Sequence, residues 1–200
     1  MTTDKKKRVR DLLRILGSFV CIWIYLPALI VYYLSKDNRI LIDSDLRRNS
    51  CHCSFQLSTS LLLLYFIHCD RYFRTLFYYR IGAVCAALIS WIRPGDRYFI
   101  LSRTTRLGKG CLIAHPYSTI LNAERIGDNF SCIHCTTIGD KGGKRPVLGK
   151  NVSLGAHVTI IGGVHIGDNV VIGAGSVVVS DVPCNSVVAG NPARVIKTIL

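Results

Sequence analysis

A strict six-residue period runs through residues 148–182 and constrains the fold of this chain more than any other feature. The first position of every unit is aliphatic. The residues at that position are Leu148, Leu154, Ile160, Ile166, Ile172 and Val178. A repeat of this length is typical of a β-helix, in which each unit is one short strand and one corner. A single unit cannot bury its apolar face alone, so stacked coils must share a continuous core.

Glycine follows the aliphatic residue in four of these six units. The four are Gly149, Gly155, Gly167 and Gly173. Because glycine has no Cβ, we expect these residues to turn the corners of the coil, where φ is unusual and a side chain would clash. Residues 107–200 are therefore predicted to form a parallel β-helix.

The period begins before residue 148, but it is interrupted twice. It starts at Leu107 and Ile113 and then slips by one residue. The slipped pattern places the next inward residues at Ile120, Ile126, Cys132 and Ile138. The second interruption is the loop at residues 140–147, after which Leu148 resumes the period.

Two histidines share one phase of this period. His115 is two residues after Ile113, and His134 is two residues after Cys132. If three units make one coil, the one-residue slip places His134 directly above His115. Adjacent strands are about 4.8 Å apart, so the two imidazoles would be stacked neighbours on one face. The remaining histidines lie at other phases or outside the repeat, and we interpret them as surface or structural residues: His52, His68, His157 and His165.

An imidazole near its ordinary pKa can take a proton from an alcohol as the alcohol oxygen attacks a carbonyl. The sequence contains no Gly-x-Ser-x-Gly elbow, so a covalent acyl-enzyme is not supported. Direct attack of an acceptor hydroxyl on a thioester is the simpler chemistry for the pair His115 and His134.

The positive charge of the chain is concentrated in its N-terminal half. The formal net charge is +13; residues 1–106 carry 17 Lys/Arg against 7 Asp/Glu, whereas residues 107–200 carry 8 against 5. Basic residues beside apolar helices suit an anionic membrane surface. The same apolar context argues against nucleic acid as the partner.

Residues 1–50 begin with a basic stretch and continue into a long apolar one. From Ile15 to Ser35 there are 21 residues without a charge, a length that can span a bilayer. The positive-inside rule keeps the basic stretch in the cytoplasm. Pro27 removes a helical hydrogen bond in the middle of the run, so we expect two half-helices bent at that residue. We predict that residues 5–35 attach the protein to the inner face of the cell membrane as a re-entrant or interfacial anchor; the alternative is a helix buried between subunits.

Residues 51–106 are predicted to form an α-helical region. The apolar run at 57–67 is too short to span a membrane. A further apolar helix at 81–92 is closed by a turn at 93–96. These helices either lie on the membrane or cap the β-helix.

Nine cysteines do not form a convincing metal framework. Cys51 and Cys53 are separated by one residue, and the Cys132–Cys135 pair has no second pair to support it. We expect small buried hydrophobic residues in a reducing compartment, and no bound metal.

From about Leu107 to Lys197, nearly half of the chain, the sequence resembles the hexapeptide acyltransferases of the serine acetyltransferase-like family. That family includes relatives that acetylate polysaccharides, such as the colanic acid acetyltransferases. The motifs that carry the resemblance lie at residues 113–116, 133–139, 146–149, 172–178 and 188–194. The resemblance implies a left-handed β-helix, an exception to the right-handed crossover rule. It also implies a homotrimer with active sites between neighbouring subunits, and acetyl-CoA as the donor.

The resemblance also implies roles for individual residues. His115 matches the general base of the family, and His134 assists it or positions the acceptor. The residues expected to contact acetyl-CoA are Gly139, Ala156, Ala174, Arg194 and Lys197. Arg194 and Lys197 are the expected partners of its phosphates.

Three departures from the serine enzymes put serine as the acceptor in doubt. An Asp that precedes the base is replaced by Ala114, and the Asp that orients the base would fall near Ile100. The loop at 140–147 also lacks the second histidine of those enzymes. His134 replaces a glutamine and resembles the polysaccharide-modifying members, which favours a sugar of a polysaccharide or a lipid-linked glycan.

Three alternatives remain open at this point. The first is a serine O-acetyltransferase of cysteine biosynthesis, and the second is a β-helix scaffold without activity. The third is a zinc site like that of carbonic anhydrases of similar fold, which would need a third histidine in phase with His115 and His134.

Overall fold

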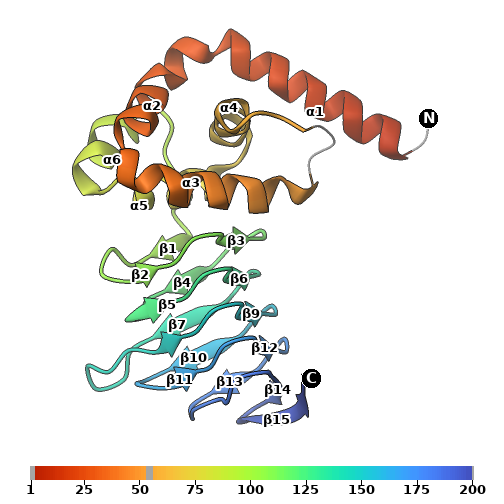
Figure 1. The fold of residues 1–200 in the computed structure, drawn as a ribbon, viewed down its shortest axis with the longest axis vertical. Coiled ribbons are helices and arrows are strands. Elements are labelled where there is room, and N and C mark those ends of the chain that lie inside the picture. The colour runs from red at the N-terminus through yellow and green to blue at the C-terminus, as the bar shows by residue number, and fades with distance from the viewer. Residues whose placement is uncertain (1–2, 53–55, 200) are drawn as a thin grey trace. The chain divides into compact units, whose positions relative to one another are not determined.

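The computed structural model describes residues 3–52 and 56–199 of the chain. It divides into two compact units, Met1–Asp96 and Arg97–Leu200. The first unit is helical, and the second is built of short strands (Figure 1).

The first unit is a cluster of helices around α4. Its described elements are α1 (Thr3–Val20), α2 (Ile22–Leu34), α3 (Lys36–Asn49), a 3-10 turn (Ser50–His52), α4 (Thr59–Cys69), α5 (Arg71–Arg80) and α6 (Ala83–Ile89). Helix α4 is apolar on every side, and all residues from Leu62 to Ile67 are buried. Such a helix must be surrounded. It packs against α1, α2, α3 and α5, and Figure 1 shows it end-on in the middle of the unit.

The bend in the long apolar run does not lie at Pro27, so that prediction is wrong. Pro27 lies inside α2, and the break falls at Cys21, whose φ of −92° and ψ of 15° depart from helical values. Among the residues that the structure describes, no single helix is both long and apolar enough to cross a membrane. Together, by length and composition, α1 from Lys5 and α2 reach that threshold, but they meet at a bend of 84°.

Two pairs of buried or half-buried polar side chains join these helices. Asp45 of α3 accepts a hydrogen bond from the Arg80 guanidinium of α5 at 2.8 Å, and both side chains are almost fully buried. Tyr25 of α2 and His68 of α4 share a hydrogen bond of 2.7 Å. Burial lowers the pKa of His68, and the nearby Arg93 guanidinium lowers it further; both effects favour the neutral imidazole.

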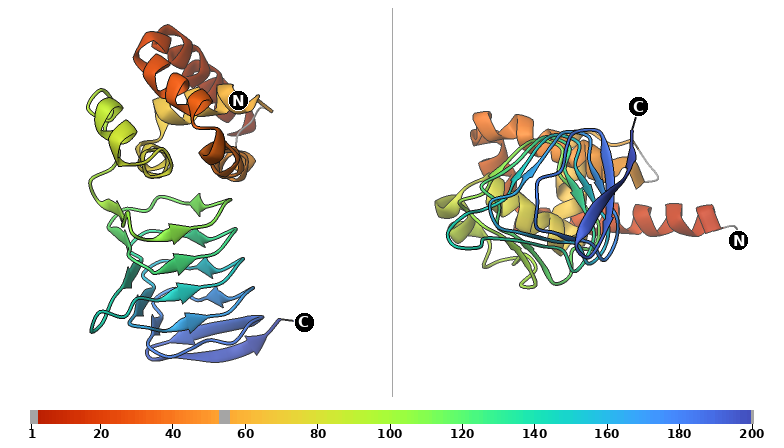
Figure 2. Two further views of the ribbon diagram at one scale, coloured as in Figure 1. Left: turned by 60° about the vertical axis from the view of Figure 1, so that its left-hand side comes forward. Right: turned by 90° about the horizontal axis from the view of Figure 1, so that it is seen from below.

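The second unit is a β-solenoid of about five turns whose strands form three faces (Figure 2). Face A contains β1 (Phe99–Leu101), β4 (Thr119–Leu121), β7 (Thr137–Gly139), β10 (Thr159–Ile161) and β13 (Val177–Val178). Face B contains β2 (Arg106–Leu107), β5 (Arg125–Ile126), β8 (Val147–Leu148) and β11 (His165–Ile166). Face C contains β3 (Leu112–Ile113), β6 (Ser131–Cys132), β9 (Ser153–Leu154), β12 (Val171–Ile172), β14 (Ser186–Gly190) and β15 (Ala193–Thr198).

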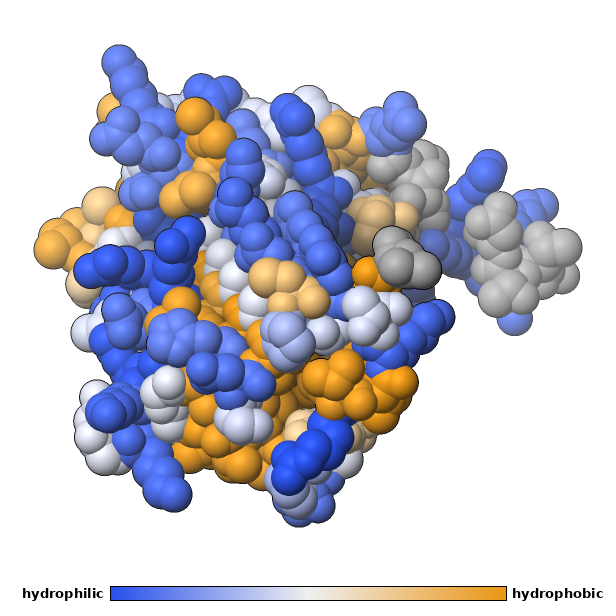
Figure 3. Space-filling model, turned by 60° about the horizontal axis from the view of Figure 1, so that its bottom comes forward, coloured by the Kyte–Doolittle hydropathy of each residue, from blue (hydrophilic) through white to orange (hydrophobic). Residues whose placement is uncertain are grey.

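Consecutive turns pair in parallel, and among the strands that the structure describes only β15 runs antiparallel to its neighbour, β14. The first strand begins at Phe99, eight residues before the predicted start of the β-helix. Phe99 and Leu101 point inward and Ile100 points outward. Because all three are apolar, the sequence does not show which of them belong to the six-residue period. Figure 3 shows hydrophobic surface in a central area bordered by hydrophilic side chains.

The inward residues of the regular turns are those that the period predicts. All six first-position residues from Leu148 to Val178 are buried, and they stack in register, as Ile138 and Ile160 do on face A. The prediction of Ile120 as an inward residue is wrong. Leu121 is fully buried and pairs with Ile138, whereas Ile120 points outward.

The four predicted corner glycines act by close approach, not by an unusual φ. None of them is among the residues with positive φ. A Cβ on Gly155 would lie 2.7 Å from the Ala174 nitrogen, and one on Gly167 would lie 2.6 Å from the Cys184 nitrogen. The left-handed corners between faces B and C are instead occupied by Gly110 and by asparagines with φ near +56° to +59°: Asn129, Asn151, Asn169 and Asn185.

Candidate functional site

His134 lies at the corner where the chain passes from face C to face A. It follows β6 by two residues and is half-buried. The His157 ring from the next turn stands edge-on to the His134 ring, with centroids 5.5 Å apart and planes at 88°. The His157 amide donates a hydrogen bond to the His134 carbonyl at 3.1 Å. The interpretation of His157 as a residue of another phase therefore missed a neighbour of the site.

His157 could have been found from its place at the corner rather than from its phase. It has a φ of +58°, and Cys135 has the same φ one turn earlier. At this corner the His157 ring contacts the ring of His134, the residue that precedes Cys135 in the turn before. A histidine one position after a predicted site column is the signal that sequence reasoning could have used.

His115 lies at the same corner, one turn above His134, but not in the register that the sequence predicts. Ile113 pairs with Cys132 and Ile120 pairs with Thr137, so seven residue steps in the upper turn face five in the lower one. The two extra residues fall between Ala114 and Tyr117. His115 therefore belongs to an insertion; it is exposed and has a φ of +49°.

The residue at the level of His134 in the upper turn is Tyr117. The Cys135 amide donates to the Tyr117 carbonyl at 2.8 Å, in the same pattern that joins His157 to His134. The prediction that His134 lies directly above His115 is wrong, because a corner can take up extra residues without shifting the next strand. Both histidines still project from the corner between faces C and A, where the insertion frees His115 from strand pairing.

The corner contains no carboxylate in the described turns. Its residues at 114–118, 133–136 and 155–158 include neither Asp nor Glu. Ile100, where the resemblance implies an orienting Asp, lies on the outer side of face A. Nothing among the described residues groups three or more His, Cys, Asp or Glu side chains as a metal site would require. Cys132, two residues before His134, is a core residue, and burial raises the pKa of its thiol to about 12.

Two predicted cofactor residues occupy the position of His134 in later turns, and we call this row of positions the column. Ala156 follows Leu154, and Ala174 follows Ile172, each by two residues, as His134 follows Cys132. The Gly175 amide donates to the Ala156 carbonyl at 2.9 Å, which stacks the two turns. Ala156 is half-buried and Ala174 is exposed. The corner thus presents imidazoles in its upper turns and a small exposed residue at Ala174 below them.

Arg194 lies close to the lower end of this column, whereas Lys197 does not. Gly173, next to Ala174, lies against Ala189, because a Cβ on Gly173 would be 3.1 Å from the Ala189 Cβ. Ala189 in turn pairs with Arg194 on the last strand, β15. Arg194 is therefore one strand further from Ala174 than Ala189 is. Lys197 pairs with Val187, three residues along β15 toward the opposite corner.

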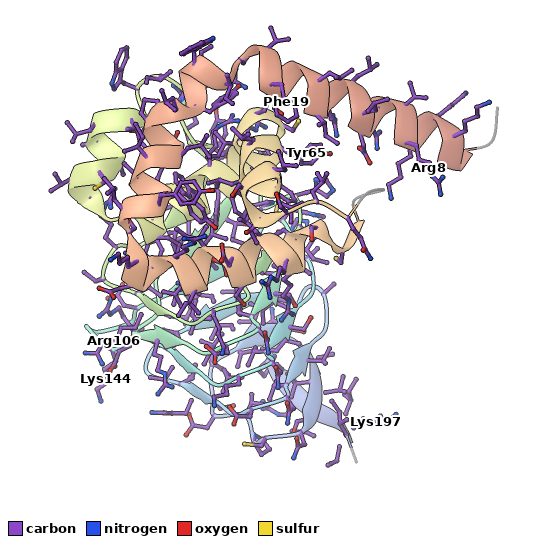
Figure 4. The ribbon with its side chains drawn as sticks, turned by 45° about the horizontal axis from the view of Figure 1, so that its top comes forward. Arg8, Phe19, Tyr65, Arg106, Lys144 and Lys197 are labelled. Atoms are coloured by element: carbon purple, nitrogen blue, oxygen red, sulfur yellow. The ribbon has the colours of Figure 1, made fainter. Side chains whose placement is uncertain are left out.

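Gly139 lies at the corner between faces A and B, at the far end of β7 from His134. The loop that follows it is closed by a bridge between Lys141 and Lys144. Figure 4 shows Lys144 and Lys197 on separate parts of the unit. One chain therefore brings together His115, His134, Ala156 and Ala174, and it leaves Gly139 and the loop at another corner.

A depression on face B, with a volume of about 710 Å³, contains none of the predicted site residues. It is lined by face B residues such as Arg125 and His165.

Comparison with known proteins places this chain among hexapeptide-repeat transferases. The family model described as "Bacterial transferase hexapeptide (six repeats)" matches residues 145–180. Serine acetyltransferase 2 of Arabidopsis thaliana is 39% identical over 99 residues, which cover 47% of this chain and 31% of the plant protein. The putative colanic acid biosynthesis acetyltransferase WcaB of Escherichia coli is 42% identical over 93 residues, covering 44% of this chain and 57% of that protein. The chain thus spans about a third of the plant relative and just over half of the bacterial one.

Solved structures extend the similarity over both units. The crystal structure of Neisseria gonorrhoeae serine acetyltransferase in complex with serine has a TM-score of 0.64 and 30% identity, covering 82% of this chain and 71% of that one. The Brucella abortus serine acetyltransferase in complex with coenzyme A has a TM-score of 0.68 at 22% identity, which shows the shared fold; it covers 86% of this chain and 72% of that one.

Proposed function

Because the chain belongs to the hexapeptide-repeat serine acetyltransferase family, we propose that it is an acetyl-CoA-dependent O-acetyltransferase acting on a hydroxyl acceptor. The observation that carries this proposal is the corner between faces C and A. Two histidines project from it above a column of small residues, Ala156 and Ala174. That arrangement offers a base beside a strip of backbone along which an extended thioester can lie.

His115 acts as the general base. It takes the proton of the acceptor hydroxyl as that oxygen attacks the thioester carbonyl, and it returns the proton to the departing thiolate. The acetyl–oxygen bond forms and the acetyl–sulfur bond breaks without a covalent enzyme intermediate. The exposed position of His115 in the insertion lets an acceptor reach the imidazole. His134 positions the acceptor, and the edge-on His157 ring limits the rotation of the His134 ring.

The proposed donor contacts are divided between two corners of the solenoid, which supports a homotrimer of left-handed β-helices with sites between subunits. Gly139 and its loop lie at the corner between faces A and B, away from Ala156 and Ala174. A neighbouring copy can bring its own loop beside this chain's column. Arg194, at the lower end of the column, and Lys197 of either copy are then the partners of the donor phosphates.

A sugar hydroxyl fits the corner better than serine does. Recognition of an amino acid needs a counter-charge for its ammonium group, and the corner residues described above include no carboxylate. A neutral sugar needs hydroxyl, imidazole and backbone partners, which Tyr117, Ser118 and His134 provide. The acceptor is a sugar of a polysaccharide or of a lipid-linked glycan, and the cytoplasmic side of the cell membrane is the place where it meets acetyl-CoA.

Serine O-acetyltransfer is the second candidate, because the similar gonococcal enzyme was crystallised with serine. Release of free coenzyme A should be measured with L-serine and with a panel of hexose and hexosamine acceptors. We expect turnover with sugars and none above background with serine. Turnover with serine alone would replace the sugar proposal, and tight acetyl-CoA binding without turnover on any acceptor would favour an inactive scaffold.

Replacing the base tests the mechanism directly. The substitution His115→Ala should lower turnover by about 10²–10⁴-fold, with little change in acetyl-CoA affinity, because it removes proton transfer and no donor contact. The matched control is His165→Ala, which removes an exposed imidazole from the outer side of face B. Steady-state kinetics and donor titration measure both effects. An unchanged rate in His115→Ala would remove this histidine from the role of base.

A further inference from the structure

The helical unit exposes large apolar side chains along one bent pair of helices and on α6. On α1, the exposed residues Val9, Leu13, Leu16 and Val20 are spaced by four, three and four, which places them on one face. On α2, Trp23 is 80% exposed and Leu34 is also exposed. On and just after α6, the exposed residues are Val84, Leu88 and Trp91. Helix α2 packs against both α1 and α6, so these side chains belong to adjoining elements.

Exposed apolar surface of this extent marks an interaction site. Single exposed apolar residues are ordinary, but three neighbouring helices that all present them are not. Both tryptophans of the chain belong to this set. Tryptophan has an apolar ring and one N–H donor, which suits a boundary between water and lipid. The Trp91 N–H already donates to the Leu88 carbonyl at 2.9 Å, so this ring can enter an apolar phase without leaving its donor unpaired.

A basic stripe runs beside the apolar stripe of α1. Lys6, Arg10 and Arg14 recur every four residues, each next to the apolar stripe. They line a shallow, open depression of about 390 Å³, and no Asp or Glu is among its lining residues. The remaining lining residues are Val9, Leu13 and His68. Cationic groups and apolar groups in one hollow match the phosphate and the upper acyl chain of a phospholipid.

The path of the helices decides between crossing a membrane and lying on it. Helix α1 carries its basic residues over its first four turns, and the bend of 84° turns α2 away from the axis of α1. Figure 4 shows Arg8 on α1 well away from Phe19, which lies near the bend. A helix with a basic stripe along an apolar face is typical of one that lies in the plane of the membrane interface.

We propose that unit Met1–Asp96 binds the surface of a bilayer that contains anionic phospholipids. The apolar side chains of α1, α2 and α6 enter the boundary between headgroups and acyl chains, and Lys6, Arg10 and Arg14 hold a lipid phosphate. The unit lies on one leaflet. This inference does not depend on acetyl transfer, because it rests on residues outside the solenoid.

The full-length protein should be mixed with vesicles of phosphatidylcholine alone and with vesicles that also contain phosphatidylserine. Because both tryptophans lie on the proposed surface, their fluorescence reports contact directly. We expect an emission shift to shorter wavelength, and quenching by a lipid that carries a quencher on its upper acyl chain. Co-sedimentation should show at least ten-fold tighter binding to the anionic vesicles.

Two variants separate the basic and apolar contributions. The pair Lys6→Glu and Arg10→Glu should weaken binding to anionic vesicles at least ten-fold, whereas the pair Arg103→Glu and Arg106→Glu in the solenoid should not. The substitution Trp23→Ser should reduce binding to both kinds of vesicle; this side chain is exposed, so helix content by circular dichroism should stay unchanged.

The proposal fails if the tryptophans stay fully accessible to an aqueous quencher in the presence of anionic vesicles. It also fails if the Lys6 and Arg10 reversals bind as tightly as the wild-type chain. If Trp23→Ser lowers the oligomeric mass and leaves vesicle binding unchanged, the surface is an interface between copies of this chain instead.

Discussion

At the scale of single residues, the corners of the solenoid depend on asparagine. Asn129, Asn151, Asn169 and Asn185 form a ladder in which each side-chain amide donates to the next side-chain carbonyl at 2.7–3.0 Å. Each has a φ in the left-handed region, which asparagine tolerates better than most residues. The ladder satisfies exposed polar groups in series and fixes the spacing of turns along one corner of the prism.

Substitutions at Asn151 should separate the two contributions of this ladder. In Asn151→Gly the backbone can keep its φ, but the ladder hydrogen bonds are lost and the unfolded chain gains freedom, so we expect the free energy of unfolding to fall by about 1–2 kcal/mol. In Asn151→Ala the left-handed backbone adds about 1–2 kcal/mol of strain. Urea denaturation followed by circular dichroism at a β-sheet wavelength measures both. Equal losses in the two variants would show that φ at this corner is unimportant.

At the scale of elements, the clean period predicted the regular turns because position and burial are linked by the coil itself. From Leu148 onward, a shift of the register by one residue would turn every inward aliphatic side chain toward solvent. In the earlier turns the period did not predict which residues point inward. Two residues are inserted before Tyr117 and one is lost before Ile126, so the net slip of one was visible while its location was not. Ile120 and Leu121 are both aliphatic, and hydropathy cannot choose between them.

The same limit explains which parts of the candidate site could be predicted. His134 follows Cys132 in a regular turn, so its corner was predictable from spacing. His115 lies in the inserted residues, where spacing carries no information about the backbone. The pairing of Asp45 with Arg80 was also out of reach, because their contact joins helices 35 residues apart in sequence. The six-residue period predicts the geometry within a turn. It does not predict contacts between residues that are far apart in the sequence.

At the scale of the whole molecule, the outer side of face A carries an apolar pair that a monomer would leave in water. Ile100 and Ile120 are neighbours in register on β1 and β4, and they are 51% and 40% exposed. Face A also separates the corner that carries His115 from the corner that carries Gly139. A neighbouring subunit packed here would bury the pair and bring together the two corners that we propose to bind acetyl-CoA.

We therefore expect the chain to form a trimer whose contact includes this pair. Light scattering after size-exclusion chromatography in a mild detergent should give three times the 22.2 kDa of one chain, once the mass of the detergent is subtracted. The substitution Ile120→Arg should shift the protein toward monomers, because a charge buried without a partner costs several kcal/mol. The same change at Val171, an exposed apolar residue on the outer side of face C, should leave the trimer intact. If Ile120→Arg keeps the mass of three chains, face A is not the contact. If Val171→Arg alone dissociates the assembly, the subunits meet through face C, and the corner with His115 must then be completed from another direction.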